Sequence, residues 1–256
     1  MTENDSFLLT LHDVSLRFGG LQALSDISVG VSSGLWTALI GPNGAGKTSL
    51  LNVICGLYAP QRGEVFLDGR RLDALGVHQR AALGLARTFQ AVQLVAEMHV
   101  LDNLLLGLHC QGRVGLWAHL VGSPGSRREE RALRDRGMAV LERYALADVW
   151  DWEVGALSLW RRKLLELARA VVGEPRLLLL DEPMGGLTMG EREAMAELLH
   201  DLRGQGLSMV MVEHDMDMVM THTDHVLVLH HGSLLAQGPP RAIQADPEVI
   251  AAYLGE

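Results

Sequence analysis

The sequence of 256 residues predicts an α/β fold, and three observations lead to that prediction. An apolar, strand-like run at 35–40 is followed by a glycine-rich loop and then by a helix-like stretch at 48–55. A second apolar run, RLLLL at 176–180, is continuous, as in parallel strands that are buried on both faces. After that run, strand-like and helix-like patterns alternate, which is typical of a parallel sheet covered by helices.

The first 70 residues are expected to be rich in strands. Three strands come first, with Gly19-Gly20 and Ser32-Ser33-Gly34 supplying the turns between them. We expect the strands at LLTLHDVSLRF (8–18), LSDISVGV (24–31) and LWTALI (35–40), a helix at TSLLNVIC (48–55) and a further short strand at EVFLDG (64–69).

Residues 98–172 have a helical pattern and interrupt the α/β sequence. After RLLLL, a stripe of apolar residues at 195–202 predicts a helix that ends at Gly204. Strands are then expected at LSMVMV, HVLVLH and SLLAQ, and a helix in the tail PEVIAAYLGE. The chain is therefore expected to be one domain, with a core at about 1–97 and 173–256 and a helical insertion at about 98–172.

The composition is that of a globular protein, with 48% apolar and 21% charged residues. No apolar run approaches the roughly 18 residues that span a bilayer, and the acidic N-terminus predicts no signal peptide. The net charge of −9 argues against a nucleic-acid binder and against adsorption to anionic lipid, so membrane association would need a protein partner. Cys55 and Cys110 are expected to be free thiols in a reducing cytosol.

The loop GPNGAGKT at 41–48 fits the pattern G-x-x-x-x-G-K-[ST]. Its glycines allow backbone N–H groups to turn toward phosphate oxygens, and the helix that follows points its positive end at the anion. Lys47 is expected to reach the β- and γ-phosphates, and Thr48 to hold Mg²⁺. The predicted nucleotide-binding residues of this loop are Gly41, Pro42, Asn43, Gly44, Ala45, Gly46, Lys47, Thr48 and Ser49.

Two carboxylates follow the run RLLLL, where a strand end would face the same ligand. Asp181 is expected to bind Mg²⁺ through water, and Glu182 to orient and deprotonate the attacking water. His214 ends the next strand, and a histidine there can donate a hydrogen bond to the γ-phosphate. The later histidines lack paired cysteines or a helical HExxH motif, so they do not predict a zinc site.

Along nearly its whole length the chain resembles the ATP-binding-cassette ATPases. The resemblance rests on the order of FGG (18–20), GPNGAGKT, RTFQ (87–90), the helix LSLWRRKLLELARAV (157–171), LLLLDEP (177–183), GGLT (185–188) and EHD (213–215). Finer features, FGGLQALSDISV, RTFQAVQLVAEMHVLDNLLLG and DPEVIAAYLGE, resemble the ATPase subunits of branched-chain amino acid importers. The linker at 107–133 also resembles one of the two ATPase subunits of those systems, while the lipopolysaccharide-export relatives are usually shorter there.

This resemblance implies a RecA-like P-loop core, an antiparallel β subdomain and an inserted α-helical subdomain. Two such chains would face head to tail with two ATP molecules between them, and closure would move two transmembrane permeases. Phe18 would stack on adenine, and Gln90 would approach Mg²⁺ and couple the nucleotide site to the helical subdomain. Ser158 would complete the site of the other chain, and His214 would act as the γ-phosphate switch.

Two stretches depart from the family pattern. Thr188 stands where Asp or Asn is common. In the signature, usually L-S-x-G-Q, Leu159 fills the variable position, Trp160 replaces the glycine and Arg161 replaces the polar residue. Because a glycine lets the backbone approach the γ-phosphate, Trp160 is expected to limit turnover, and Arg161 to offset this in part with its charge. The alternative is that Trp160 packs on the helical subdomain or on a permease.

Three functions remain open from the sequence. The leading one is an ATP-hydrolysing subunit of an importer for branched-chain amino acids or related solutes. Such a subunit would be held on the cytoplasmic face of the membrane by permease subunits. A solute-binding protein would be an indirect partner. The second is a weakly hydrolysing half of an asymmetric heterodimer, or an ATPase of the lipopolysaccharide-export type. The third, a soluble cassette acting on DNA or ribosomes, is disfavoured by the acidic charge and the single cassette.

Overall fold

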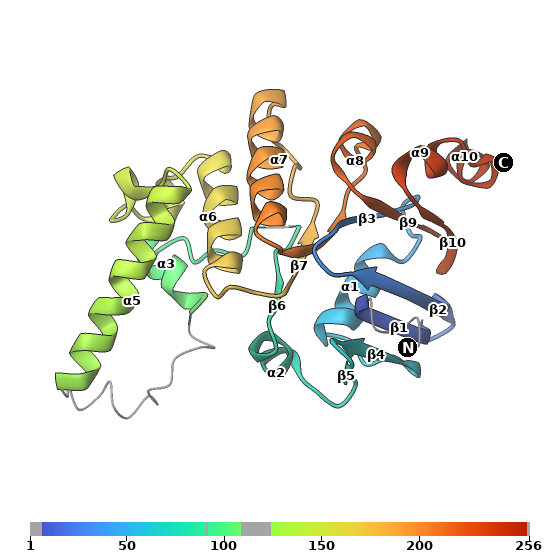
Figure 1. Cartoon of the computed structure of the whole chain (residues 1–256), viewed down its shortest axis with the longest axis horizontal. Coiled ribbons are helices and arrows are strands. Elements are labelled where there is room, and N and C mark those ends of the chain that lie inside the picture. The colour runs from blue at the N-terminus through green and yellow to red at the C-terminus, as the bar shows by residue number, and fades with distance from the viewer. Residues whose placement is uncertain (1–6, 91, 109–123, 255–256) are drawn as a thin grey trace.

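The computed structural model describes residues 7–90, 92–108 and 124–254. Cys110 and most of the linker expected at 107–133 lie outside the described residues. Within them the chain forms two sheets, with helices between and around them (Figure 1). In the part of the chain that the structure describes, no helix combines the length and apolar character needed to cross a membrane.

The larger sheet has six strands and is mostly parallel, as the alternating sequence pattern predicted. The strand order is β10-β9-β3-β8-β7-β6, and only the pair β9 and β10 is antiparallel. The strands are β3 (Trp36–Ile40), β6 (Leu85–Arg87), β7 (Leu177–Asp181), β8 (Ser208–Val212), β9 (His225–His230) and β10 (Ser233–Gly238). The carboxyl ends of β3, β6, β7 and β8 therefore meet along one edge of this sheet.

The smaller sheet is antiparallel and carries the first two predicted strands. Its order is β2-β1-β4-β5, built from β1 (Phe7–Phe18), β2 (Leu21–Ser32), β4 (Arg62–Leu67) and β5 (Arg70–Arg71). Helix α1 (Lys47–Cys55) lies between the two sheets (Figure 1). One apolar cluster joins α1 to strands of both sheets, so the phosphate loop before α1 is held by packing from two directions.

Alternation along the strands fixes the two faces of the large sheet. In β7, Leu177 and Leu179 pack toward the α1 side, whereas Leu178 and Leu180 pack toward α7 (Met189–Gly204). Because both faces are apolar, the run at 176–180 shows no polar alternation in sequence. The helices α8 (Met216–His222), α9 (Pro240–Gln244) and α10 (Pro247–Leu254) cover the other end of the sheet.

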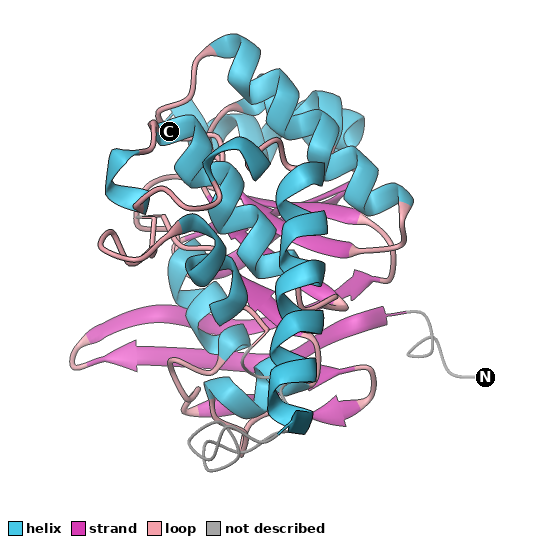
Figure 2. Cartoon of the chain, turned by 90° about the vertical axis from the view of Figure 1, so that its left-hand side faces the viewer, coloured by secondary structure: helices cyan, strands magenta, loops and turns pink. Residues whose placement is uncertain are grey.

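The helical stretch between the core segments consists of several short elements and one long helix. They are α3 (Val100–Leu106), α5 (Pro124–Arg143), the 3-10 turns Ala147–Val149 and Val154–Ala156, and α6 (Leu159–Val171). Leucines of α3 and α6 share a continuous cluster with α7, which seats these helices against the large sheet. Figure 2, viewed from this end, shows helices in front of the strands.

Sequence patterns did not predict five of the short elements. These are β5, β6, α8, α9 and α2 (Val77–Ala82), each of at most seven residues. A run of this length holds fewer than two helical turns or two strand repeats, so its periodicity is not distinguishable from chance. One of them, β6, is central to the site described next.

Candidate functional site

The loop at 41–46 joins β3 to α1 and has the backbone geometry of an anion cradle. Gly41, Gly44 and Gly46 have φ of 148°, 81° and 104°, which L side chains rarely adopt. A Cβ added at Gly46 would lie 2.7 Å from the carbonyl oxygen of Ala23. No side chain caps α1, so the N–H groups of its first turn are available to a bound anion. The loop therefore fits a phosphate group.

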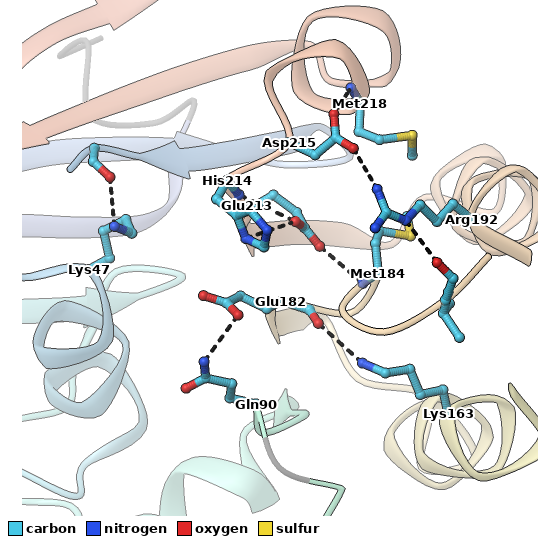
Figure 3. Close-up of polar contacts among 12 residues, drawn as sticks. Lys47, Gln90, Lys163, Glu182, Met184, Arg192, Glu213, His214, Asp215 and Met218 are labelled. Atoms are coloured by element: carbon cyan, nitrogen blue, oxygen red, sulfur yellow. Dashed lines mark hydrogen bonds and ion pairs between the residues drawn. The ribbon is translucent and has the colours of Figure 1, made fainter. Parts of the chain in front are cut away.

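Lys47, the first residue of α1, places its ammonium inside this loop. Its Nζ donates to the carbonyl oxygens of Gly41, at 2.7 Å, and Pro42, at 3.0 Å (Figure 3). Burial lowers the pKa of Lys47, and the carboxylates of Glu182 and Asp181 oppose that shift. The charge of Lys47 thus lies close to both carboxylates, with Thr48 next to it on an exposed position of α1.

The two carboxylates at the end of β7, Asp181 and Glu182, have different surroundings. Asp181 is 4% exposed, and its Oδ2 pairs with the Nη2 atom of Arg87 at 2.9 Å. Glu182 is half-buried and has a φ of 50°, an uncommon conformation that persists only where the surrounding structure enforces it. The Nε2 atom of Gln90 donates to Oε2 of Glu182 at 3.0 Å (Figure 3). The structure therefore brings Gln90, Asp181 and Glu182 together.

His214 follows β8 and stands over the same edge of the sheet. Its side chain is 67% exposed and lies 3.8 Å, from Nδ1 to Oε2, from the carboxylate of Glu213. Glu213 is buried and accepts the N–H of Met184 at 3.0 Å. Burial raises the pKa of Glu213, against the effect of its backbone hydrogen bonds and of His214. The exposed imidazole is free to reach a ligand, while Glu213 fixes the backbone behind Glu182.

Three charged residues in or behind this site were not singled out from the sequence. Lys163 of α6 is 6% exposed and donates to the carbonyl oxygen of Glu182 at 3.2 Å (Figure 3). Arg87 pairs with Asp181, and Glu213 holds Met184. All three lie inside motifs that were recognised. Each is a charged residue in a stretch that is otherwise apolar or buried, and a buried charge needs a partner of opposite charge or a hydrogen bond. This feature of the sequence could have identified them as residues that support the site.

Phe18 lies at the end of β1, beside the turn that leads into β2. Its side chain is 44% exposed, and its ring meets Tyr58 edge-on with centroids 5.1 Å apart. The strand that follows this turn passes the phosphate loop, because Ala23 lies beside Gly46. An exposed aromatic ring at this end of the molecule is available to a flat ligand.

The signature stretch forms the start of α6. Ser158 is the N-cap, and its Oγ accepts the N–H of Arg161 at 3.3 Å. Leu159 is exposed and lies against Gly186, whereas Trp160 is half-buried and packs against the apolar cluster of the helical region. The guanidinium of Arg161 pairs with Asp148 at 2.8 Å. In this arrangement the indole and the guanidinium both serve contacts within the helical region.

The donor set at the sheet edge suits Mg²⁺. A hydroxyl, a carboxylate and an amide, from Thr48, Asp181 and Gln90, are hard oxygen ligands, and Mg²⁺ commonly binds through one or two carboxylates together with substrate phosphates. Among residues 7–90, 92–108 and 124–254, no cluster of three or more His, Cys, Asp or Glu side chains forms a site for another metal ion.

Comparison with known proteins agrees with this geometry. The family model described as "ABC transporter" matches residues 24–185. The chain belongs to the ABC transporter family. A second model, described as "Branched-chain amino acid ATP-binding cassette transporter", matches residues 233–256 of the cassette. The expected resemblance and the α/β fold of an ABC ATPase are thereby confirmed.

Several curated relatives match the cassette over most of its length. The high-affinity branched-chain amino acid transport ATP-binding protein LivG of Salmonella typhimurium is 39% identical over 250 residues, which cover 97% of this chain and 98% of the relative. BraF of Pseudomonas aeruginosa, which has the same description, is 37% identical with the same coverage.

Solved structures give the same fold. A nucleotide-free ATP-binding cassette from an ABC transporter matches with a TM-score of 0.85 and 30% identity, over 98% of this chain and all of that one. The ADP conformation of an ATP-binding cassette of an ABC transporter matches with a TM-score of 0.84 and 31% identity, covering 98% of this chain and 99% of that one.

Proposed function

We propose that this cassette is the ATP-hydrolysing subunit of an importer for branched-chain amino acids or related small solutes. The match of residues 233–256 to a family model of such transporters carries this proposal, because that segment lies outside the stretch matched by the general ABC transporter model. Relatives with that transport role also match 97% of the chain.

Binding is proposed to use the loop and the residues around it. The N–H groups of residues 43–49 and the ammonium of Lys47 would hold the phosphates, and Phe18 would stack on adenine. Thr48, Asp181 and Gln90 would hold Mg²⁺, which supplies charge neutralisation on the β- and γ-phosphate oxygens. Because Lys47 now donates to two loop carbonyls, bound phosphate would replace those contacts with charge-assisted ones.

Hydrolysis is proposed to depend on Glu182 and His214. The carboxylate of Glu182 would orient a water molecule and accept its proton as the water oxygen bonds to the γ-phosphorus and ADP leaves. Gln90, which now donates to Glu182, would turn toward the metal and release this carboxylate for the water. His214 is 67% exposed and would donate a hydrogen bond to the γ-phosphate.

The cassette is proposed to work in a dimer on the cytoplasmic face of the membrane. Ser158, Leu159, Trp160 and Arg161 would face the nucleotide of the second cassette, and the two cassettes would drive two permease subunits that receive solute from a binding protein. We propose boundaries at about 98 and 172 for the helical subdomain, since α3, α5 and α6 lie between them and pack on one another.

A second candidate is a weakly hydrolysing half of an asymmetric heterodimer. The arrangement of the signature favours it, because the half-buried Trp160 packs against the apolar cluster of the helical region and Arg161 is paired with Asp148. Neither side chain is then oriented by a contact toward a partner's phosphates.

Co-expression with the neighbouring genes tests the proposal. The tagged chain should retain two hydrophobic permeases and a second cassette on purification. Vesicles that contain this complex should take up leucine, but not arginine, when ATP and the binding protein are present. A matched complex that carries Lys47→Ala should assemble and show no uptake. Purification of the chain without any permease, or a complex that takes up neither branched-chain amino acids nor related small solutes when ATP is present, would contradict the proposal.

A further inference from the structure

Arg87, the last residue of β6, contacts three parts of the nucleotide site. Its Nη2 atom pairs with Oδ2 of Asp181 at 2.9 Å. Its Nη1 atom donates to Oδ1 of Asn52, at 2.6 Å, and to the sulfur of Cys55, at 3.2 Å, both on α1. Its guanidinium also lies over the ring of Phe89, 4.9 Å from the centroid.

The ion pair between Arg87 and Asp181 is buried on both sides. The two side chains are 5% and 4% exposed, in contrast to the pair of Arg176 and Asp68, whose side chains are 52% and 58% exposed. The Nε atom of Arg87 is buried and has no hydrogen-bond partner among the described residues. An unsatisfied donor costs free energy, so the contacts of the other guanidinium atoms must hold Arg87 in this place.

These contacts constrain the orientation of Asp181. The hydrogen bond from Arg87 occupies Oδ2, and Oδ1 accepts no hydrogen bond from any residue that the structure describes. Since Mg²⁺ requires nearly ideal octahedral geometry, a carboxylate that rotates freely binds it less well than one that is fixed. Groups that hold a metal ligand in place commonly affect metal affinity as strongly as some ligands do.

We propose that Arg87 is a positioning residue for the magnesium site. Arg87 would fix Asp181 through Oδ2 and leave Oδ1 open to Mg²⁺ or to a water molecule bound to it. Through Phe89 and Asn52, Arg87 also ties the loop that carries Gln90 to the helix after the phosphate loop. This inference rests on the proposed function, in which Asp181 helps to hold Mg²⁺. The opposing possibility is that Arg87 competes with Mg²⁺ for the charge of Asp181. In that case replacement of Arg87 would strengthen magnesium binding, whereas our proposal predicts that it weakens it.

The test measures ADP affinity by titration calorimetry, once with Mg²⁺ and once with a chelator. The ratio of the two affinities is the magnesium advantage. The variants are Arg87→Lys and Arg87→Met, with Arg176→Met as the matched control, since that arginine holds an exposed carboxylate at 2.6 Å. Lysine keeps the charge but cannot contact Asp181 and Asn52 with separate nitrogens. Melting temperatures report folding, and Arg87→Lys decides the result if Arg87→Met does not fold.

We expect both Arg87 variants to lose about tenfold of the magnesium advantage while their ADP affinity in chelator stays within about twofold of wild type. The control should match wild type in both conditions. An unchanged advantage, an increased advantage, or an equal loss of affinity with and without Mg²⁺ would overturn the inference. A wild-type protein that shows no magnesium advantage would instead remove the metal site from the proposed function, and this inference with it.

Discussion

Replacement of Glu182 by glutamine should greatly slow hydrolysis while leaving ATP binding intact. Glutamine has the same length, and its amide oxygen can accept the hydrogen bond that Gln90 donates at 3.0 Å. The carbonyl oxygen of Glu182, which accepts from Lys163, is unchanged. The backbone φ of 50° is equally strained for both side chains, so the free energy of unfolding should change by less than about 1 kcal/mol.

The expected loss is that of a general base. Removing such a group typically costs about 10²- to 10⁴-fold in rate, which corresponds to about 3–5 kcal/mol in the activation free energy. Phosphate release from the purified complex at saturating MgATP measures this loss, and calorimetry measures ATP affinity. Glu174→Gln is the matched control, because Glu174 has a φ of 52° and its side chain is 83% exposed. Turnover by Glu182→Gln within about threefold of wild type would refute the assignment of Glu182 as the base.

Two further predictions concern the signature and the phosphate loop. Trp160→Gly should raise turnover with little change in ATP affinity, but should lower the melting temperature, since the half-buried indole packs on the helical region and glycine costs about 1 kcal/mol in a helix. Trp160→Ala separates the loss of indole packing from the gain in backbone freedom, because alanine removes the indole but does not have the conformational freedom of glycine. Equal turnover in wild type, Trp160→Gly and Trp160→Ala would contradict the prediction that Trp160 limits turnover. The affinity for ATP should be highest at pH values below the lowered pKa of Lys47, where the ammonium is charged. It should fall as the pH rises through that pKa, since the neutral amine no longer pairs with phosphate. A flat affinity profile up to the ordinary lysine pKa, or the same decline in Lys47→Arg, would contradict this explanation.

The sequence was most informative where the local pattern alone determines the structure. The loop at 41–48 carries glycines at the positions that have positive φ, and the continuous run at 176–180 forms a strand buried on both faces. Their order along the chain was sufficient to predict a parallel sheet in which the carboxylates at the end of β7 lie at the edge where β3 also ends.

The remaining features depend on contacts between distant segments. The pair of Arg87 and Asp181 joins residues 94 positions apart, and Lys163 reaches Glu182 from a helix whose packing no sequence period specifies. At position 160, the replacement of the signature glycine by Trp160 suggested that the start of α6 is impaired in its approach to the γ-phosphate. The structure adds an apolar surface on which the indole packs, which the pattern of α6 alone does not show.

The most direct test of the account is a calorimetric titration with MgATP of Glu182→Gln and of the double variant Lys47→Ala with Glu182→Gln. The first change prevents hydrolysis during the titration, so binding is measured alone. We expect the single variant to bind ATP and the double variant to bind at least about tenfold more weakly, as for the loss of a charge-assisted contact of about 1.5–3 kcal/mol. Equal affinities in two folded proteins, or no binding by Glu182→Gln, would contradict the claim that residues 41–48 form the nucleotide site.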